Sequence, residues 1–428
     1  MTTSALADAA ARASWPGVAA VPRYGVRAAV ARRLFARAVS RLPITVVHGP
    51  APEVTVPYGR PVMRIVRPAA FFARVGDCGL IGFGESYMAG DWDSDDLPGL
   101  LTAFAAHLPT LVPPALQRLR RLAVRSRPDA DADDGGADGA RRNVAHHYDL
   151  SNDLFALFLD ETMSYSSALF EEGPDGTLAG DFAAAQRRKI DRLLDLAGVG
   201  PGARVMEIGT GWGELALCAG RRGARVRSLT LSAEQRDLAA ARIARAGLAD
   251  RVQVELRDYR DAAGVHDAVL SVEMIEAVGA RHWREYFAVL YRLLAPGGRV
   301  GLQAITMPHD RMLASRGTHT WIEKYIFPGG MLPSTEAIIE HASAAGLRPA
   351  APGPDGRLSF GSHYAETLRR WRERLAACAP QVAALGFDPV FRRMWEFYLA
   401  YSQAGFASGY LDVQQFLLAR PTTPEDQR

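Results

Sequence analysis

The feature that most constrains the fold of this chain is an alternation of short apolar runs with helical segments after residue 200. Five runs rich in Val, Ile and Leu have the length of strands: 203–209, 224–232, 251–259, 266–275 and 298–307. The segments between them, such as 233–247, carry apolar residues at helical spacing. Strands that alternate with helices in this way form a parallel, doubly wound sheet. The sequence therefore predicts an α/β fold for this part of the chain.

A polar segment at residues 125–142, RSRPDADADDGGADGARR, separates this part from the N-terminal residues. It has no apolar period, so it is predicted to be a flexible linker between domains 1–124 and 143–428. In the first domain, 27–42 is predicted to be a helix, and ITVVHG and PVMRIVR short strands. The following stretch, 71–97, mixes strand-like apolar residues with turn residues. We therefore expect a smaller α+β domain in front of the α/β domain.

The first domain is basic. Residues 1–127 contain 16 arginines and 8 acidic residues, a balance of +8, whereas the remainder carries −5 of the overall +3. This balance suggests an anionic partner, either lipid or nucleic acid. The predicted helix 27–42 has arginines opposite its apolar residues, which suits the surface of an anionic membrane. Packing on its own core, and frequent use of Arg by a GC-rich genome, are the alternatives.

Three cysteines, Cys78, Cys218 and Cys378, are scattered along the chain. They form neither a disulfide framework nor a metal cluster, so a reducing cytoplasm and no metal site are expected. The N-terminus lacks the basic start and apolar core of a signal peptide. No run of about 18 apolar residues is present, so no transmembrane segment is expected.

A glycine-rich turn follows the first predicted strand of the α/β domain. EIGTGWGE (207–214) places Gly209, Gly211 and Gly213 where a strand passes into a helix, and glycine there lets the backbone approach a ligand closely. The same turn serves dinucleotides, and a purely structural turn is a further alternative. Glu207 precedes the first glycine, which suits an ammonium group better than a pyrophosphate.

Two further stretches extend this cofactor site. RDY ends the third predicted strand and places Asp258 and Tyr259 where an adenine ring would lie. Together with the glycines, this is the pattern of S-adenosylmethionine-dependent methyltransferases with a Rossmann-like fold. Where a ribose-binding acid is usual after the second strand, the chain reads TLSAEQ, which makes Thr230, Ser232 and Gln235 candidates for cofactor binding.

Motifs along most of the chain resemble the cyclopropane fatty acid synthase family. NVAHHYDLSNDLFALFLDETMSYSSALF (143–170) resembles the signature that opens its catalytic domain. TLSAEQ, SVEMIEAVG, LLAPGGRVGLQAIT, YIFPGGMLPS, HYAETLRRW and MWEFYLAYSQAGF match the same family in order. GFGESYMAGDWDSDDL (82–97) resembles the N-terminal domain of its longer bacterial members. The wider family includes enzymes that make methylene- and methyl-branched, tuberculostearic-type fatty acids.

This resemblance implies a reaction. Such enzymes transfer the methyl group of S-adenosylmethionine to a cis double bond of a phospholipid acyl chain, which leaves a carbocation. A base, thought to be bicarbonate in the cyclopropane synthases, then removes a proton. Tyr165 and Ser166 fall at positions that the family uses for the methionine part of the cofactor.

The resemblance also implies a set of catalytic residues. Glu276 is expected to hold the bicarbonate near the cation, where a fixed negative charge stabilises the cation. Because two negative groups together are costly unless they share a proton, a protonated Glu276 is the alternative. Ile305 and Tyr364 are implicated too, although Ile305 could be core and Tyr364 could cap a helix. The chain departs from the family at two positions of the anion site, since Ser167 replaces the usual cysteine and Gln303 the usual histidine. Both can still donate hydrogen bonds to an anion.

These two departures favour a 10-methylene-branched product, formed through a hydride shift and later saturated by a flavin- or nicotinamide-dependent reductase. A cyclopropane-forming synthase is the alternative, and a non-catalytic lipid-binding protein is a more distant one. A nucleic-acid methyltransferase is disfavoured because the chain lacks the Asn/Asp-Pro-Pro-aromatic motif. The enzyme is expected to be cytoplasmic and peripheral on the inner face of the membrane. Its first domain is expected to bind the lipid surface or to form a homodimer.

Overall fold

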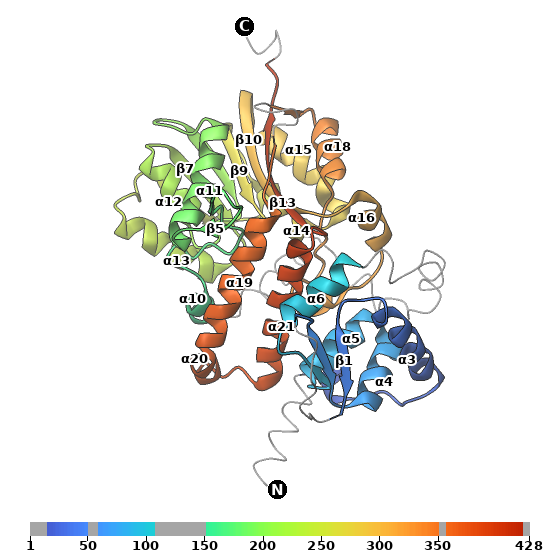
Figure 1. The fold of residues 1–428 in the computed structure, drawn as a ribbon. Coiled ribbons are helices and arrows are strands. Elements are labelled where there is room, and N and C mark those ends of the chain that lie inside the picture. Colours follow the sequence, from blue (N-terminus) through green and yellow to red (C-terminus); the bar gives the residue numbers. More distant parts are fainter. Residues whose placement is uncertain (1–14, 50–58, 108–150, 351–356, 423–428) are drawn as a thin grey trace. The chain divides into compact units, whose positions relative to one another are not determined.

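The computed structural model describes residues 15–49, 59–107, 151–350 and 357–422 (Figure 1). The predicted linker 125–142 lies outside the described residues. Contacts within the chain define two compact units. The first consists of Met1–Pro128, His319–Ile326 and Leu368–Tyr410, and the second of Asp129–Thr318, Phe327–Thr367 and Leu411–Arg428. The units thus differ from the domains drawn from the sequence, whose boundaries stay a prediction.

The second unit is built on one large sheet. Its strand order is β11-β13-β10-β9-β6-β7-β8, and β12 also pairs with β13. The central strands β6 to β10 run parallel, while β13 is antiparallel to β10. The strands occupy these residues: β6 Arg204–Ile208, β7 Arg225–Thr230, β8 Val252–Leu256, β9 His266–Val272, β10 Leu294–Thr306, β11 Arg348–Pro349, β12 Arg357–Ser359 and β13 Asp412–Ala419. The predicted α/β fold is therefore confirmed.

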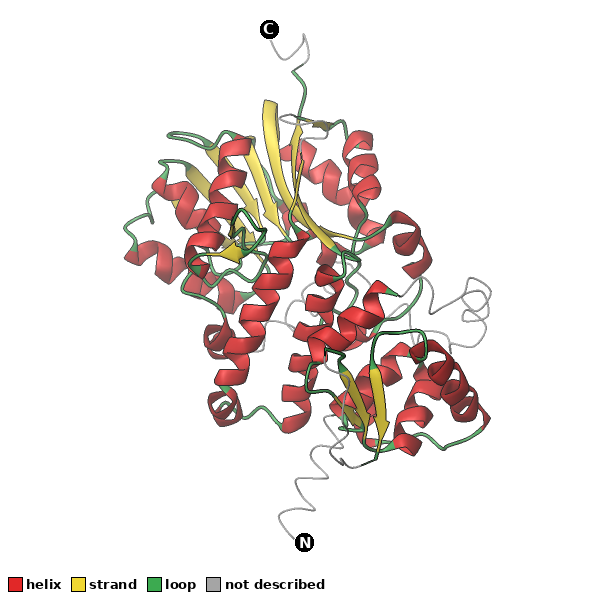
Figure 2. Cartoon of the chain, viewed as in Figure 1, coloured by secondary structure: helices red, strands yellow, loops and turns green. Residues whose placement is uncertain are grey.

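Helices cover both faces of this sheet (Figure 2). The helices of this unit are α10 Asn152–Phe158, α11 Phe182–Ala197, α12 Glu214–Arg221, α13 Ala233–Arg245, α14 Ile275–Val278, α15 Trp283–Leu293, α16 His309–Ser315, α18 Thr335–Ala344 and the start of α19 Gly361–Ala377. Of these, α15 and α18 pack on one face of the sheet and α11, α12 and α13 on the other. The remaining short elements are β4 Glu171–Glu172 and β5 Leu178–Ala179, and two 3-10 turns, Tyr259–Asp261 and Ala280–His282.

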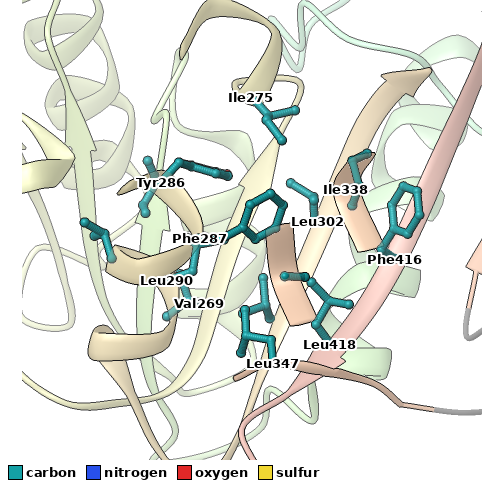
Figure 3. Close-up of a cluster of buried hydrophobic side chains, with 14 of the residues drawn as sticks. Val269, Ile275, Tyr286, Phe287, Leu290, Leu302, Ile338, Leu347, Phe416 and Leu418 are labelled. Atoms are coloured by element: carbon teal, nitrogen blue, oxygen red, sulfur yellow. The ribbon is translucent and has the colours of Figure 1, made fainter. Parts of the chain in front are cut away.

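A separate hydrophobic core lies on each face. Figure 3 shows the core on which α15 and α18 pack, with Phe287 and Leu290 against Val269 of β9 and Leu302 of β10. Phe416 and Leu418 extend it onto β13. The core on the opposite face joins α11, α12 and α13 to β6, β7 and β9. Burial on both faces explains why these strands read as continuous apolar runs.

The first unit contains a small sheet of order β1-β2-β3 and a set of helices. Its strands are β1 Thr45–His48, β2 Val62–Ile65 and β3 Trp92–Asp93. Its helices are α2 Pro16–Ala19, α3 Val26–Val39, α4 Pro68–Cys78, α5 Leu80–Met88, α6 Leu97–Ala106, α17 Trp321–Tyr325, the rest of α19, α20 Ala379–Ala384 and α21 Pro389–Ala407. The helix predicted over 27–42 and the first two strands are present.

The sequence stretch 71–97 differs from its expected mixture of strand and turn, because most of it is helical. Pro68 is the first residue of α4, where a backbone N–H would have no partner within the helix, so the N–H that proline lacks is not needed. Gly79, with a φ of +59°, then separates α4 from α5. The aromatic residues typical of a strand, Phe71 and Phe72, are instead buried within α4. No described helix has both the length and the apolarity that crossing a bilayer requires.

Candidate active site

The centre of the candidate site is the residue that follows β9, where the backbone leaves the strand conformation. The strand ends at Val272, earlier than the predicted 266–275, and Glu273 has a φ of +50°. A non-glycine residue in this left-handed region costs about 1–2 kcal/mol. Such strained residues persist where their surroundings fix them, and they cluster at functional sites. The N–H of Glu273 donates to the carbonyl oxygen of Gln303 on β10 at 2.8 Å, and this hydrogen bond fixes the backbone of Glu273 against β10.

Three donors from distant parts of the chain meet at the Glu273 carboxylate. Oε1 accepts a hydrogen bond from the backbone N–H of Ser167 at 2.9 Å and one from Nε2 of Gln303 at 2.8 Å. Oε2 accepts one from the hydroxyl of Tyr364 at 2.6 Å. Residues that the sequence assigned to an anion site therefore do lie together, but the carboxylate that they bind is that of Glu273. Ser167 contributes its backbone, since its hydroxyl donates to the Ala168 carbonyl.

The Gln303 side chain is oriented by a second glutamine. Nε2 of Gln415, on β13, donates to Oε1 of Gln303 at 3.0 Å and to the carbonyl oxygen of Lys189 at 2.9 Å. Oε1 of Gln415 in turn accepts from Arg192 at 2.6 Å. These partners leave the amide nitrogen of Gln303 directed at Glu273. The network thus makes Gln303 a donor toward the carboxylate.

Glu276 lies one helical turn further on, in α14. Its Oε1 accepts the backbone N–H of Ile305 at 2.6 Å, whereas its shielded Oε2 has no hydrogen-bond partner among the described residues. Burial, and secondarily the charge of Glu273, raise the pKa of Glu276 to about 8. Glu276 is therefore protonated at neutral pH. Ile305 acts in this geometry through its backbone.

A buried lysine lies next to the donors of the site. Nζ of Lys189, on α11, donates to Oγ of Ser166 at 2.6 Å and to the carbonyl oxygen of Ser167 at 3.2 Å. Burial lowers the pKa of Lys189 to about 8, and the nearby charge of Glu273 opposes that shift. Burial also raises the pKa of Glu273, against which Lys189 and the three donors act. Lys189 therefore favours the ionised form of Glu273.

The glycine-rich turn between β6 and α12 has the conformation that its glycines predicted. Gly209, Gly211 and Gly213 all have positive φ values, +95°, +52° and +91°. A Cβ on Gly211 would meet no atom within 4 Å, so this point of the turn faces open space. A Cβ on Gly209 would meet Met274 at 3.4 Å. The turn therefore lies beside Met274, the residue that directly follows Glu273.

The acid in front of this turn has a hydrogen-bond partner within the protein. Glu207 is buried and its Oε2 accepts a hydrogen bond from Oγ of Ser228 at 2.5 Å. Burial raises its pKa to about 8, so Glu207 is a neutral partner of Ser228 at neutral pH. A direct ion pair with an ammonium group therefore stays a prediction.

The remaining predicted cofactor residues are dispersed over neighbouring turns. Ser232 caps α13 by accepting the N–H of Gln235 at 3.2 Å, and Thr230 donates to Gln235 at 3.0 Å. Asp258 is engaged by Arg260 through contacts of 2.9 and 2.7 Å, and Tyr259 packs edge-on against Tyr286.

The segment before α11 carries two more of the predicted residues. Tyr165 packs its ring against Phe155, with centroids 5.1 Å apart. Ser166 is buried and accepts the hydrogen bond from Lys189. Both side chains thus have defined contacts within the protein, and their role in binding the cofactor stays a prediction.

Sequence reasoning missed Glu273, Lys189 and Gln415. Glu273 stands in the same apolar stretch as Glu276, so an unexplained charge was visible there. Lys189 is one of only two lysines in the chain, which was a weaker signal. In the part of the chain that the structure describes, no group of three His, Cys, Asp or Glu side chains could hold a metal ion.

Comparison with known proteins gives close relatives. The family described as mycolic acid cyclopropane synthetase matches residues 137–416. Tuberculostearic acid methyltransferase UfaA1 of Mycobacterium tuberculosis is 54% identical over 421 residues, which cover 96% of each chain. Cyclopropane-fatty-acyl-phospholipid synthase of Escherichia coli K12 is 33% identical over 365 residues, 83% of this chain and 87% of that one.

A solved structure agrees with these relatives. The crystal structure of the mycolic acid cyclopropane synthase CmaA1 complexed with SAH and CTAB is similar with a TM-score of 0.58 and 33% identity. The similarity covers 65% of this chain and 98% of CmaA1. The family match spans more than half of the chain and confirms the resemblance seen in the motifs. The chain belongs to the mycolic acid cyclopropane synthetase family.

Proposed function

We propose that this protein transfers the methyl group of S-adenosylmethionine to a cis double bond in the acyl chain of an unsaturated phospholipid. The observation that carries the proposal is the 54% identity to a tuberculostearic acid methyltransferase along 96% of both chains. The E. coli relative is a cyclopropane-fatty-acyl-phospholipid synthase, which supports a phospholipid acyl chain as substrate. Incubation of the protein with labelled cofactor and oleoyl phospholipid, followed by mass spectrometry of the acyl chains, tests it.

The glycine-rich turn is where the cofactor would be held. The open space at Gly211 fits a ligand that approaches the backbone closely. In α/β sheets, ligands bind at the carboxyl ends of the parallel strands, and this turn follows the carboxyl end of β6. The complex of the relative CmaA1 with SAH supports the same group here. Gly209, Gly211, Gly213 and the turn at Ser232 would hold it, and the cofactor supplies the methyl group.

For the product we propose a methylene-branched chain, of the kind from which a reductase could make a methyl-branched fatty acid. The name of the M. tuberculosis relative supports this outcome over a cyclopropane. Gln303, one of the two departures from the family, donates to Glu273 through its side chain, which supports an anion site unlike that of the cyclopropane synthases. Ser167 donates through its backbone N–H, a contact that does not depend on its side chain. Bicarbonate would compete with the Glu273 carboxylate for the hydrogen-bond donors of this site.

For the location we propose that α3 lies on an anionic membrane surface. Val26, Val30 and Leu34 follow one another at four-residue spacing and are 82%, 50% and 46% exposed. Arg27, Arg33 and other exposed arginines lie on the same helix. Exposed apolar side chains next to cationic ones fit the boundary between headgroups and acyl chains. A phospholipid substrate requires such an approach to the membrane.

A further inference from the structure

We propose that the carboxylate of Glu273 is the base of the reaction, so that the enzyme carries within its chain the anion that bicarbonate would otherwise supply. The inference rests on the proposed methyl transfer to an alkene. It is carried by the geometry of β9, β10 and α19 around one side chain.

The first step of the argument is the position of Glu273. It follows β9, and β9 lies beside β6, whose Ile208 pairs with Ser271. The carboxyl ends of both strands therefore meet at one edge of the sheet, with the glycine-rich turn after β6 and Glu273 after β9. Met274 would contact a Cβ on Gly209, which confirms that these two segments are adjacent. A group that follows β9 is thus close to whatever binds the turn.

The second step is the set of donors around the carboxylate. A bicarbonate ion and a glutamate side chain present the same pair of oxygens to hydrogen-bond donors. The N–H of Ser167, the amide of Gln303 and the hydroxyl of Tyr364 all donate to Glu273, and buried Lys189 adds a positive charge nearby. With these donors engaged, no separate anion is needed to satisfy them. A strained backbone at Glu273 is the cost of placing its carboxylate there.

The third step is the chemistry. Methyl transfer leaves a carbocation on the acyl chain, and a hydride shift moves the positive charge to the carbon that bears the new methyl group. A C–H bond of that methyl group then breaks, its electron pair forms the C=C bond of the methylene group, and the proton forms an O–H bond with Glu273. The proton leaves later to water. A proton next to a carbocation is very acidic, so a carboxylate need only be ionised and well placed.

The fourth step separates the two glutamates. Glu276 has a pKa of about 8 and a backbone donor on one oxygen, so at neutral pH it is a protonated side chain. Burial raises the pKa of Glu273 as well, but its three donors and Lys189 act against that shift and favour its anion, whereas the charge of Glu273 adds to the shift of Glu276. Two carboxylates in one site with opposite protonation states are a common division between base and neutral acid. This assigns proton removal to Glu273.

The experiment compares wild type with two variants, each in bicarbonate-free buffer and in buffer with added bicarbonate. Glu273→Gly removes the carboxylate and leaves its space, and glycine suits the φ of +50°. Glu273→Gln keeps the side chain but not the charge, so it fills the space without providing a base. Methylated acyl chains formed per minute are measured by mass spectrometry. Thermal unfolding and S-adenosylhomocysteine affinity are measured for each protein as controls of folding.

We expect wild type to work equally fast in both buffers. Glu273→Gly should lose at least about 100-fold in bicarbonate-free buffer and recover at least about tenfold when bicarbonate is added. Glu273→Gln should be slow in both buffers. If wild type slows without bicarbonate, or if Glu273→Gln stays fast, the proposal is overturned. Failure of bicarbonate to restore Glu273→Gly would overturn it too, because the proposal gives the two anions the same place. A wild type that methylates no lipid would instead refute the proposed function.

Discussion

The hydroxyl of Tyr364 donates to Oε2 of Glu273 at 2.6 Å, although the two residues are 91 positions apart. A hydrogen bond from a hydroxyl group to a carboxyl oxygen is stronger when the carboxyl group is ionised. The contact joins α19 to the end of β9 and fixes the second oxygen of the carboxylate. The first oxygen is fixed by Ser167 and Gln303. The orientation of Glu273 is therefore determined from both sides.

Removal of the Tyr364 hydroxyl should affect the chemical step. We expect Tyr364→Phe to lower kcat about tenfold, since one charged hydrogen bond contributes about 1.5–3 kcal/mol and two other donors remain. The KM for S-adenosylmethionine should be unchanged. Tyr291→Phe, which removes a hydroxyl from α15, is the matched control. A rise in the cofactor KM of Tyr364→Phe with constant kcat would show that Tyr364 binds the cofactor instead.

Glu276 should make stability depend on pH. Its folded pKa of about 8 lies above that of an unfolded glutamate, so the folded state retains a proton that the unfolded state loses. Its contribution is therefore largest at acidic pH and declines as pH rises from about 4.5 to about 8, by up to about 1.4 kcal/mol per pH unit. Glu276→Gln cannot ionise. The free energy of unfolding in urea, wild type minus variant, should fall between pH 5 and pH 8, and parallel curves would contradict this assignment.

Gly211 should matter for the cofactor more than for folding. A valine there meets open space but must adopt a φ of +52°, which costs about 1–2 kcal/mol. Gly247→Val is a matched control, since Gly247 has a φ of +70° and open space at the end of α13. Both variants should lose similar stability, and only Gly211→Val should lose affinity for S-adenosylhomocysteine in calorimetry. Equal affinities in the two variants would rule out this turn as the cofactor site.

Helix α3 should govern membrane binding. Arg27→Gln, Arg33→Gln and Arg37→Gln together should weaken sedimentation with anionic vesicles by up to about 100-fold, at about 1 kcal/mol for each arginine. Val30→Ser with Leu34→Ser should weaken it as well, whereas Leu256→Ser, an equally exposed apolar residue at the end of β8, should not. Salt should weaken the binding of wild type. Binding that none of these changes affects would leave α3 a packing or dimerising helix.

The sequence predicted the α/β sheet well because its parallel strands are buried on both faces and read as apolar runs. It did not predict β13, since Gln414 and Gln415 interrupt that pattern with polar side chains. It also missed α4 and α5, where aromatic residues and glycines obscured the helical period. Local hydrophobic patterns indicate which residues are buried, but they do not show which strand a segment with polar side chains, such as β13, will pair with.

The candidate site was predicted in its members but not in its centre. Motifs pointed to Ser167, Gln303 and Tyr364 as neighbours of an anion, and the structure brings all three together. The identity of that anion depends on the register of β9, β10 and β13 and on the backbone turn at Glu273. These features depend on residues far apart in the chain, so they cannot be predicted from one glutamate within an apolar stretch. The family resemblance implies Glu276, whereas the role of Glu273 follows only from the structure.

The most direct test of the account is to supply S-adenosylmethionine with a fully deuterated methyl group, together with oleoyl phospholipid, to the purified protein. Mass spectrometry of the released acyl chains then counts the deuterium atoms that remain. Methyl transfer followed by proton removal from the same methyl group predicts two deuterium atoms in each product, and ozonolysis should convert the methylene group into a mid-chain ketone with release of dideuterated formaldehyde. A product that retains all three deuterium atoms, or unmodified acyl chains, would contradict the account.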